Sequence, residues 1–248
     1  KENRESWYIQ GHIGSTWKDG QYFRTRDMAY VRPAFEDLLK RLQTDYIDIY
    51  YTHWQTPDFS LYPLEETMDT LLQLKKEGKI RAIGASNVTA KIIEKYCSLG
   101  QLDVIQEKYS ILDTHIADEL LPVCQKHHVS IQAYSPLEQG LLTGKVTQDT
   151  VLSPTDVRNK NKFWAQKSRL HILNVLQKLT PYTEKYSCSL SNLIIYLTAA
   201  SLPDLHVLCG ARKPEQIIDN VKTLSLNLEE ADLSEMSQLF EQLRNSIR

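Results

Sequence analysis

The sequence predicts an α/β fold built around a mainly parallel sheet. Along its 248 residues, short runs rich in β-branched and aromatic residues alternate with stretches whose apolar residues recur at helical spacing. Such alternation implies right-handed crossovers that return each strand parallel to the one before it. The composition, with 42% hydrophobic and 24% charged residues, excludes a disordered chain. At this length a single α/β barrel domain is an ordinary outcome.

Six strands are expected, each a short run of residues that favour extended backbone. These runs are residues 7–9, 46–51, 80–84, 104–106, 130–134 and 206–208. Helices are expected between them, because apolar residues recur at three- and four-residue spacing. The helices cover residues 35–42, 64–72, 89–99, 116–126, 172–179 and 193–197, then a segment from 214 and a last one over 232–243. Residues 135–161 show neither pattern, and so long an irregular stretch is typical of a functional loop.

Glycine, proline and acidic residues indicate where several helices begin and end. Gly78 stands where a helix would close with a left-handed residue. Pro122 should limit or bend its helix, whereas Pro214 suits the first turn of a helix. Asp232 with Glu235 resembles a capping box for the last helix.

Two parallel architectures could use these strands. A Rossmann sheet needs about six, but no GxGxxG motif follows a strand and opens a helix. A (β/α)₈ barrel needs eight strands, and six cannot close one. If the fold is a barrel, about two βα units precede Lys1, and the chain, which does not begin with Met, is processed or an excerpt. Residues 1–248 would then form a single, N-terminally incomplete barrel domain.

Charge and cysteine content exclude several functional classes. With 29 basic and 31 acidic residues, the net charge is −2, so the chain has no cationic excess for nucleic acid. No apolar run approaches the length of a membrane span. The four cysteines are widely spaced and form no CxxC pair, which favours reduced thiols in a cytoplasmic protein. Neither a metal-ligand spacing nor a GxSxG motif occurs.

Polar or small residues stand at or just after the end of every expected strand. In chain order they are His12, His53, Ser86-Asn87, Gln106, Tyr134-Ser135 and Gly210-Ala211-Arg212. Because the carboxyl ends of parallel strands meet at one edge of a sheet, these residues should face a shared site.

Each of these residues also has a plain structural interpretation when taken alone. His53 could be a hydrogen-bonded structural histidine, and Ser86-Asn87 could cap the following helix. Gln106 could simply end its strand, and Tyr134 could pack in the core. Arg212, together with Lys213, could be a solvated basic turn.

Taken together, the same residues suit a nicotinamide dinucleotide. Amide-binding side chains, an aromatic plate and a cation pair before a helix N-terminus are the groups that such a ligand requires. The glycine-containing segment YSPLEQGLLTG offers backbone amides to a pyrophosphate. A neutral imidazole at His53 could orient a carbonyl or move a proton.

The chain resembles the aldo-keto reductase family over its whole length, from the third barrel strand onward. Five segments carry the resemblance in the family's order: DYIDIYYTHW, GKIRAIGASN, QEKYSILD, AYSPLEQGLLTGK and GARKPEQIIDN. It is most similar to the bacterial branch that reduces methylglyoxal and related small aldehydes. The resemblance implies a (β/α)₈ barrel that transfers a hydride from NAD(P)H to an aldehyde or ketone.

The resemblance also implies a role for each site residue. His53 matches the catalytic histidine that orients the substrate carbonyl. Ser86, Asn87 and Gln106 match the ligands of the nicotinamide carboxamide, and Tyr134 matches the aromatic that stacks on the ring. The pyrophosphate side comprises Ser135, Leu137, Gln139 and Gly140, and the adenosine end Gly210, Ala211, Arg212, Gln216 and Asn220. Arg212, with Lys213, could pair with a 2′-phosphate, so NADPH is the expected cofactor and NADH the alternative.

The sequence departs from the family's catalytic set. The family's aspartate and tyrosine belong to a βα unit that would precede Lys1, and His12 stands at the position of its lysine. Histidine is only partly charged near neutral pH and cannot replace a permanent ammonium. A second interpretation is therefore a catalytically impaired, nucleotide-binding or regulatory homologue. The expected partner is a small carbonyl substrate, with no nucleic acid or membrane, and the oligomeric state is not predicted.

Overall fold

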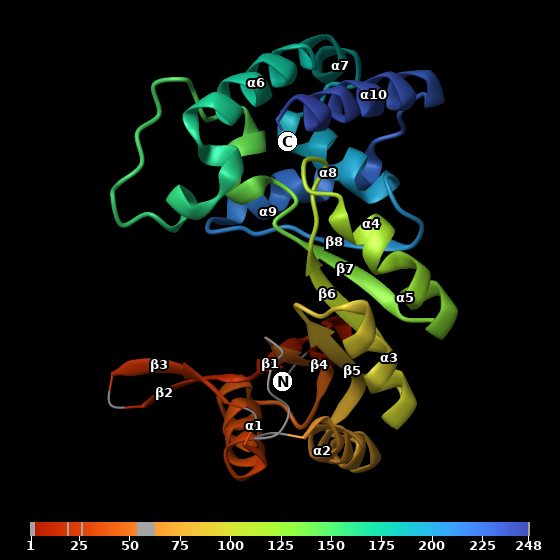
Figure 1. The fold of residues 1–248 in the computed structure, drawn as a ribbon. Helices are drawn as coiled ribbons and strands as arrows, with labels where there is room; N and C mark the ends of the chain where they lie inside the picture. The colour runs from red at the N-terminus through yellow and green to blue at the C-terminus, as the bar shows by residue number, and fades with distance from the viewer. Residues whose placement is uncertain (1–2, 19, 26, 54–62, 248) are drawn as a thin grey trace. The chain divides into compact units, whose positions relative to one another are not determined.

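The chain divides into two compact units (Figure 1). The structure, a computed structural model, describes residues 3–18, 20–25, 27–53 and 63–247. Unit 1 comprises Lys1–Glu107 and Ile116–Gln132, and unit 2 comprises Lys108–His115 and Ala133–Arg248. The division into one domain or more stays a prediction of the sequence.

In the described part of the chain, six strands form one sheet in the order β1-β4-β5-β6-β7-β8. Their bounds are β1 Gln10–Ile13, β4 Ile47–His53, β5 Ile80–Ser86, β6 Val104–Lys108, β7 Ser130–Tyr134 and β8 Leu205–Leu208. Apart from a separate hairpin, the strands neighbour one another in chain order, as expected when each crossover returns beside the previous strand. The predicted α/β class is confirmed, and the main sheet has the six strands expected, to which the hairpin adds two that were not predicted. The arrangement is that of part of a (β/α)₈ barrel.

The register of unit 1 aligns the carboxyl ends of its strands. β1 pairs with β4, β4 with β5 and β5 with β6, all in parallel. His53 lies opposite Ser86, and Ser86 lies opposite Gln106. The crossover helices are α1 Met28–Leu42, α2 Leu64–Lys76, α3 Ala90–Leu99, α4 His115–Glu119 and α5 Leu121–His127. The parallel pairing therefore sets three of the predicted polar residues in one row.

The N-terminal segment differs from the prediction. The first strand begins at Gln10, after a short 3-10 helix at Arg4–Ser6, because Trp7 and Tyr8 are 69% and 81% exposed and do not join the sheet. An antiparallel hairpin, β2 Ser15–Lys18 and β3 Gln21–Arg24, follows β1 in a region where no strand was predicted. The sequence Asp19-Gly20 between the two strands is a common hairpin signal, although the prediction made no use of it.

Helix ends agree with the prediction in unit 1. Gly78 adopts a left-handed φ of 73° just after α2. The helix expected over 116–126 is split into α4 and α5, with Pro122 in the first turn of α5. The cap of α3 is Thr89, whose side chain accepts the Ile92 N–H, so Ser86-Asn87 does not cap this helix.

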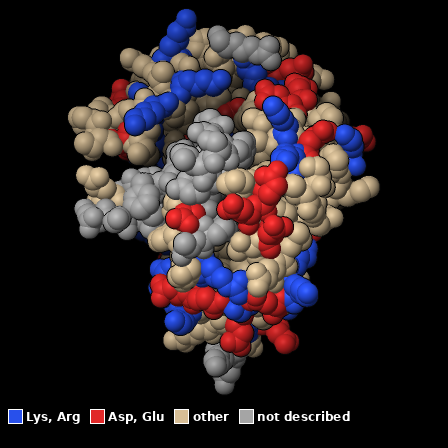
Figure 2. Space-filling view, turned by 60° about the horizontal axis from the view of Figure 1, so that its bottom comes forward, with Lys and Arg blue, Asp and Glu red and all other residues tan. Residues whose placement is uncertain are grey.

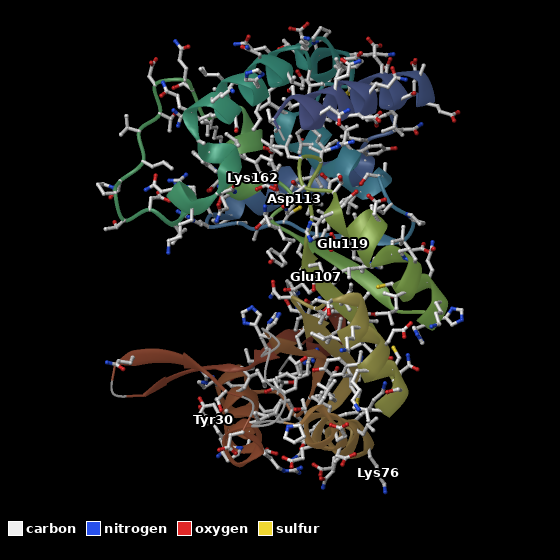
Figure 3. The ribbon with its side chains drawn as sticks, in the orientation of Figure 1. Tyr30, Lys76, Glu107, Asp113, Glu119 and Lys162 are labelled. Carbon is white, nitrogen blue, oxygen red and sulfur yellow. The ribbon has the colours of Figure 1, made fainter. Side chains whose placement is uncertain are left out.

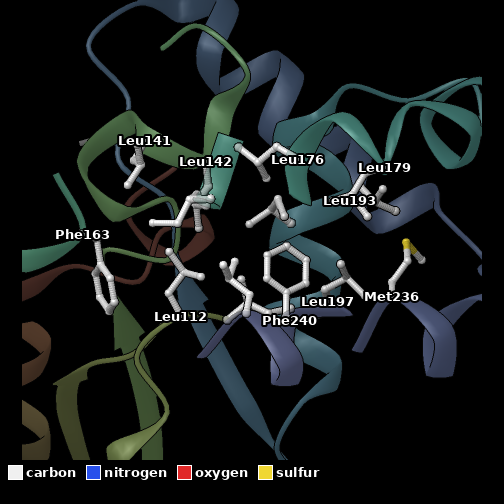
Figure 4. Close-up of a cluster of buried hydrophobic side chains, with 14 of the residues drawn as sticks. Leu112, Leu141, Leu142, Phe163, Leu176, Leu179, Leu193, Leu197, Met236 and Phe240 are labelled. Atoms are coloured by element: carbon white, nitrogen blue, oxygen red, sulfur yellow. The ribbon is translucent and has the colours of Figure 1, made fainter. Parts of the chain in front are cut away.

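The helices of unit 2 enclose its hydrophobic core (Figure 4). They are α6 Gln166–Gln177, α7 Thr180–Lys185, α8 Leu190–Ala200, α9 Pro214–Val221 and α10 Glu230–Ser246. Leu141 and Leu142, from the 3-10 helix η2 Glu138–Thr143, are completely buried against this core with Phe240 of α10. The core thus anchors the first part of the long irregular stretch of residues 135–161.

The predicted capping box of the last helix is wrong. α10 begins at Glu230 without a side-chain cap. The carboxylate of Asp232 instead accepts hydrogen bonds from Lys185 Nζ at 2.7 Å and Tyr186 Oη at 2.5 Å. The Asp232 side chain therefore bonds to partners distant along the chain and does not cap the helix.

The charged side chains on the surface and the character of the helices can be compared with the sequence. Basic and acidic side chains are interspersed on the face drawn in Figure 2, in keeping with the net charge of −2. Among the described helices, none has both the length and the apolar character needed to traverse a bilayer.

Candidate active site

Two histidines and a glutamine meet at the strand ends of unit 1. The ring of His12, on β1, lies 5.4 Å from the ring of His53, at the end of β4, at an interplanar angle of 70°. His12 Nε2 is 3.2 Å from Gln106 Oε1. Ser86 lies in register between His53 and Gln106, and Asn87 Nδ2 donates to Ser86 Oγ at 3.0 Å. All the site residues that the sequence predicted in unit 1 are therefore neighbours.

The environment of His12 favours the neutral imidazole. The ring stacks on Tyr51, with centroids 4.8 Å apart and planes at 15°. Partial desolvation lowers the pKa of His12 below its usual value, and the hydrogen bond with Gln106 only partly opposes this. The group at this position therefore carries no permanent positive charge near neutral pH.

A series of buried hydrogen-bonded side chains next to His12 orients Gln106. Tyr51 Oη donates to Gln132 Oε1 at 2.6 Å, and Gln106 Nε2 donates to the same oxygen at 3.4 Å. The amide nitrogen of Gln106 thus faces Gln132, while its oxygen faces His12. Sequence reasoning missed Tyr51 and Gln132, although both are polar side chains within expected strands, where an inward position needs a partner.

Replacing Gly84 with alanine should displace Tyr51 and so disturb these hydrogen bonds. A Cβ at Gly84 would lie 2.3 Å from Cδ1 of the buried Tyr51 ring, which has no room to move. We expect the free energy of unfolding to fall by about 1–3 kcal/mol, as for overpacked cores. Urea denaturation measures this, with Gly210→Ala as the control because a Cβ there meets no atom within 4 Å. Equal stability of the two variants would contradict the packing argument.

Glu107 holds the turn that follows β5 (labelled in Figure 3). Its side chain is buried, and Oε1 accepts the Val88 N–H at 2.7 Å. Asn87, directly before, has a left-handed φ of 57°. Burial raises the pKa of Glu107 to about 7, against the opposing hydrogen bonds from the backbone of Val88 and Asn87. This residue was not predicted, because the expected strand ended at Gln106, although a carboxylate directly after a strand is a signal of such a role.

The raised pKa of Glu107 predicts a pH-dependent stability. Its folded pKa of about 7 lies above the ordinary value of 4.5. The contribution to stability is therefore complete below pH 4.5 and is lost as the pH rises to 7, by roughly 3 kcal/mol. Glu107→Gln should remove this loss, whereas Glu119→Gln, at an exposed carboxylate, should keep it. Urea denaturation at pH 5 and pH 8 tests this; parallel pH dependence in wild type and Glu107→Gln would refute it.

Unit 2 contains a cavity of about 1020 Å³. Ten of the predicted site residues line it: Tyr134, Ser135, Leu137, Gln139, Gly140, Gly210, Ala211, Arg212, Gln216 and Asn220. Lys213 does not line it. Gln216 Oε1 accepts the backbone N–H groups of Arg212 and Lys213, at 2.6 and 3.1 Å, and so fixes the turn before α9. The cavity is of the size that holds a cofactor.

Sequence reasoning missed a second wall of this cavity. Lys145, Asp156 and Arg158 line it and come from the later part of the long irregular stretch, where the sequence predicted no site residue beyond Gly140. Arg158 Nε and Nη2 contact the two carboxylate oxygens of Asp156, at 2.9 and 2.6 Å. This pairing lowers the pKa of Asp156 to about 2. The cavity therefore combines cations with a carboxylate that is ionised at neutral pH.

The backbone of the first cavity wall, formed by residues 134–140, is strained. Ser135, Glu138 and Gln139 have left-handed φ values of 61°, 45° and 56°, and Gly140 follows at 96°. Such conformations persist at non-glycine positions only where surrounding contacts hold them, and they gather at ligand sites. Among the described residues, no cluster of His, Cys, Asp and Glu forms a metal site.

A sequence model of the aldo/keto reductase family matches residues 16–241. The chain belongs to the aldo/keto reductase family. It is 41% identical over 238 residues to the NADH-specific methylglyoxal reductase of Escherichia coli (strain K12), covering 96% of this chain and 72% of that protein. It is 34% identical to an aldo-keto reductase of Bacillus subtilis (strain 168), covering 86% of this chain and 65% of that protein.

The solved structures agree with this membership. The glycerol dehydrogenase of Gluconobacter oxydans superposes with a TM-score of 0.84 at 26% identity, over 93% of this chain and 71% of that one. Aldo/keto reductases are oxidoreductases that use nicotinamide cofactors, so membership supports the cofactor class expected from the strand-end residues.

Proposed function

We propose that this aldo/keto reductase reduces a small aldehyde or ketone, of the methylglyoxal type, to the alcohol with NAD(P)H. The observation that carries the proposal is the cavity of unit 2, because ten residues predicted from the sequence to bind the coenzyme line it. The name of the Escherichia coli relative supports methylglyoxal as the first substrate to test.

The lining of the cavity fits a dinucleotide. Its basic side chains suit a pyrophosphate, and a Cβ at Gly140 or Gly210 would meet no atom within 4 Å, so the backbone there is open to a ligand. Tyr134 is half-buried and would stack on the nicotinamide ring. Ser135, Leu137, Gln139 and Gly140 would hold the pyrophosphate side, and Gly210, Ala211, Arg212, Gln216 and Asn220 the adenosine end.

In unit 1, Ser86, Asn87 and Gln106 are the proposed ligands of the nicotinamide carboxamide. Gln106 is already oriented by Gln132, which reduces the ordering needed on binding. His53 would donate a hydrogen bond to the substrate carbonyl and fix its direction. When bound, the reduced nicotinamide supplies the hydride.

The coenzyme form remains part of the proposal. Arg212 supports NADPH, because a guanidinium can pair with a 2′-phosphate. The relative's name supports NADH. A cytoplasmic location and a single domain over residues 1–248 are likewise proposed rather than observed.

A second candidate is a nucleotide-binding homologue with little turnover, acting as a sensor or regulator. The specific observation in its favour is His12, whose lowered pKa leaves the lysine position of the family uncharged near neutral pH.

One assay separates the two candidates. NADH or NADPH is added to the protein and binding is read from tryptophan fluorescence; methylglyoxal is then added and coenzyme oxidation is followed by absorbance. Carbonyl-dependent oxidation is the result expected for the reductase. Binding without oxidation would favour the sensor, and absence of both would refute the proposed function.

A further inference from the structure

Glu138 is a completely buried carboxylate for which the proposed function has no use. It stands in the middle of the first cavity wall, yet of residues 134–140 it does not line the cavity, whereas its neighbours Leu137 and Gln139 do. Its side chain is therefore directed away from the ligand space. A buried carboxylate requires hydrogen-bond or ionic partners for both oxygens.

Those partners come from several segments of unit 2. Ser110 Oγ donates to Glu138 Oε1 at 2.6 Å. Lys108 Nζ lies 3.2 Å from Oε2, and Asn161 Nδ2 donates to the same oxygen at 3.0 Å. Lys108 also pairs with Asp113, labelled in Figure 3, at 2.9 Å. The carboxylate is thus fixed in position and paired with a cation that it shares with Asp113.

The backbone of Glu138 also has a side-chain partner. Trp164 Nε1 donates to the Glu138 carbonyl oxygen at 3.0 Å. Glu138 and Gln139 are both left-handed, a conformation that non-glycine residues adopt only when contacts impose it. The contacts to Glu138 therefore account for the path of the wall that is proposed to hold the pyrophosphate.

Asn161 connects this wall with the second one. Besides Glu138, its Nδ2 donates to Gln139 Oε1 at 3.3 Å, and its Oδ1 accepts the Phe163 N–H at 3.0 Å. Asn161 directly follows the 3-10 helix η3, Val157–Lys160, whose Val157 and Arg158 line the cavity. The side-chain amide of Asn161 thus connects the second wall, through hydrogen bonds, with the buried carboxylate of Glu138 in the first wall.

We propose that Glu138 is a positioning residue for coenzyme binding: through Ser110, Lys108 and Asn161 it sets the spacing of the two cavity walls. The inference rests on the proposed function, since it names what fixes the same site. It assigns Glu138 no contact with the coenzyme or the carbonyl. The effect should therefore fall on coenzyme affinity and leave the KM of the carbonyl substrate unchanged.

The test uses two single substitutions and their combination in the full chain. Glu138→Gln removes the negative charge, and Asn161→Asp sets two carboxylates against each other. Each should raise the Kd for NADH, NADPH and ADP-ribose by roughly tenfold or more. The double variant restores one donor and one charged acceptor, because the amide introduced at position 138 can donate to the carboxylate introduced at position 161, so its Kd should return toward the wild-type value. Glu241→Gln, at an exposed carboxylate of unit 2, is the matched control.

The outcomes separate this inference from the proposed function. Higher Kd in both single variants, with recovery in the double variant and with all three variants folded under the assay conditions by circular dichroism, supports the positioning role. Wild-type coenzyme affinity in Glu138→Gln, or additive losses in the double variant, would overturn it while the proposed function stands. A wild-type protein that binds no coenzyme would refute the proposed function and this inference with it.

Discussion

Replacing Asp48 with alanine should lower the free energy of unfolding by roughly 3–5 kcal/mol, the usual cost of breaking a buried ion pair. Asp48 is 3% exposed and accepts hydrogen bonds from the Ile9 N–H at 2.8 Å, Arg4 Nη2 at 2.8 Å and Arg81 Nη1 at 3.0 Å. One carboxylate thus joins the N-terminal segment, β4 and β5. Arg81 is 57% exposed, so most of the loss should come from Arg4 and the backbone N–H.

The same carboxylate predicts acid sensitivity. Burial alone would raise the pKa of Asp48, but the Ile9 N–H and Arg4 outweigh it and hold the pKa below its usual value. Its contribution is therefore complete above the unfolded pKa and is lost as the pH falls through the folded one. Urea denaturation at neutral and acidic pH measures both effects. Asp37→Ala is the control, because its exposed pair with Arg41 should contribute less than about 1 kcal/mol; equal losses in the two variants would contradict the assignment.

Replacing His12 with lysine should raise the rate of carbonyl reduction by about a hundredfold. The proposed reaction places negative charge on the carbonyl oxygen, and proton transfer by a positioned group typically contributes this much or more. The native His12 is predominantly neutral near pH 7 because partial desolvation lowers its pKa, whereas lysine would bring a permanent ammonium. The measurement is kcat with NADH or NADPH and methylglyoxal.

A control is needed because any added charge could alter the assay. His171→Lys adds the same charge on the exposed face of α6 and should leave kcat unchanged. Equal kcat in wild type and His12→Lys would show that the charge at this position does not limit the reaction. The proposed reduction would then have to proceed without it.

The sequence predicted the fold best where one local pattern determines the outcome. Polar residues at the ends of β4, β5 and β6 were expected to meet because parallel strands share an edge, and the register aligns His53, Ser86 and Gln106. The first strand was misplaced because Trp7 and Tyr8 have strand-forming side chains but stay exposed. Asp232 stands at the spacing of a helix cap. Only the folded chain shows that its carboxylate accepts hydrogen bonds from Lys185 and Tyr186 instead.

The supporting contacts of the site could not be predicted from the sequence. Glu107, Gln132 and Glu138 hold the predicted residues in place, and each acts through a partner distant along the chain: Val88, Tyr51 and Ser110, respectively. No spacing rule connects such pairs. Asp156 and Arg158 were missed in the same way, because an irregular stretch has no period that shows which residues face a cavity.

Calorimetric titration of the intact protein with NADH and with NADPH tests the central claim most directly, namely that the cavity of unit 2 holds a nicotinamide dinucleotide. We expect one coenzyme per chain. The affinity should fall by about tenfold or more in Tyr134→Ala, which removes a stacking partner, and in Arg212→Glu, which reverses a charge of the cavity lining. No binding of either coenzyme, or binding that both substitutions leave unchanged, would contradict the account.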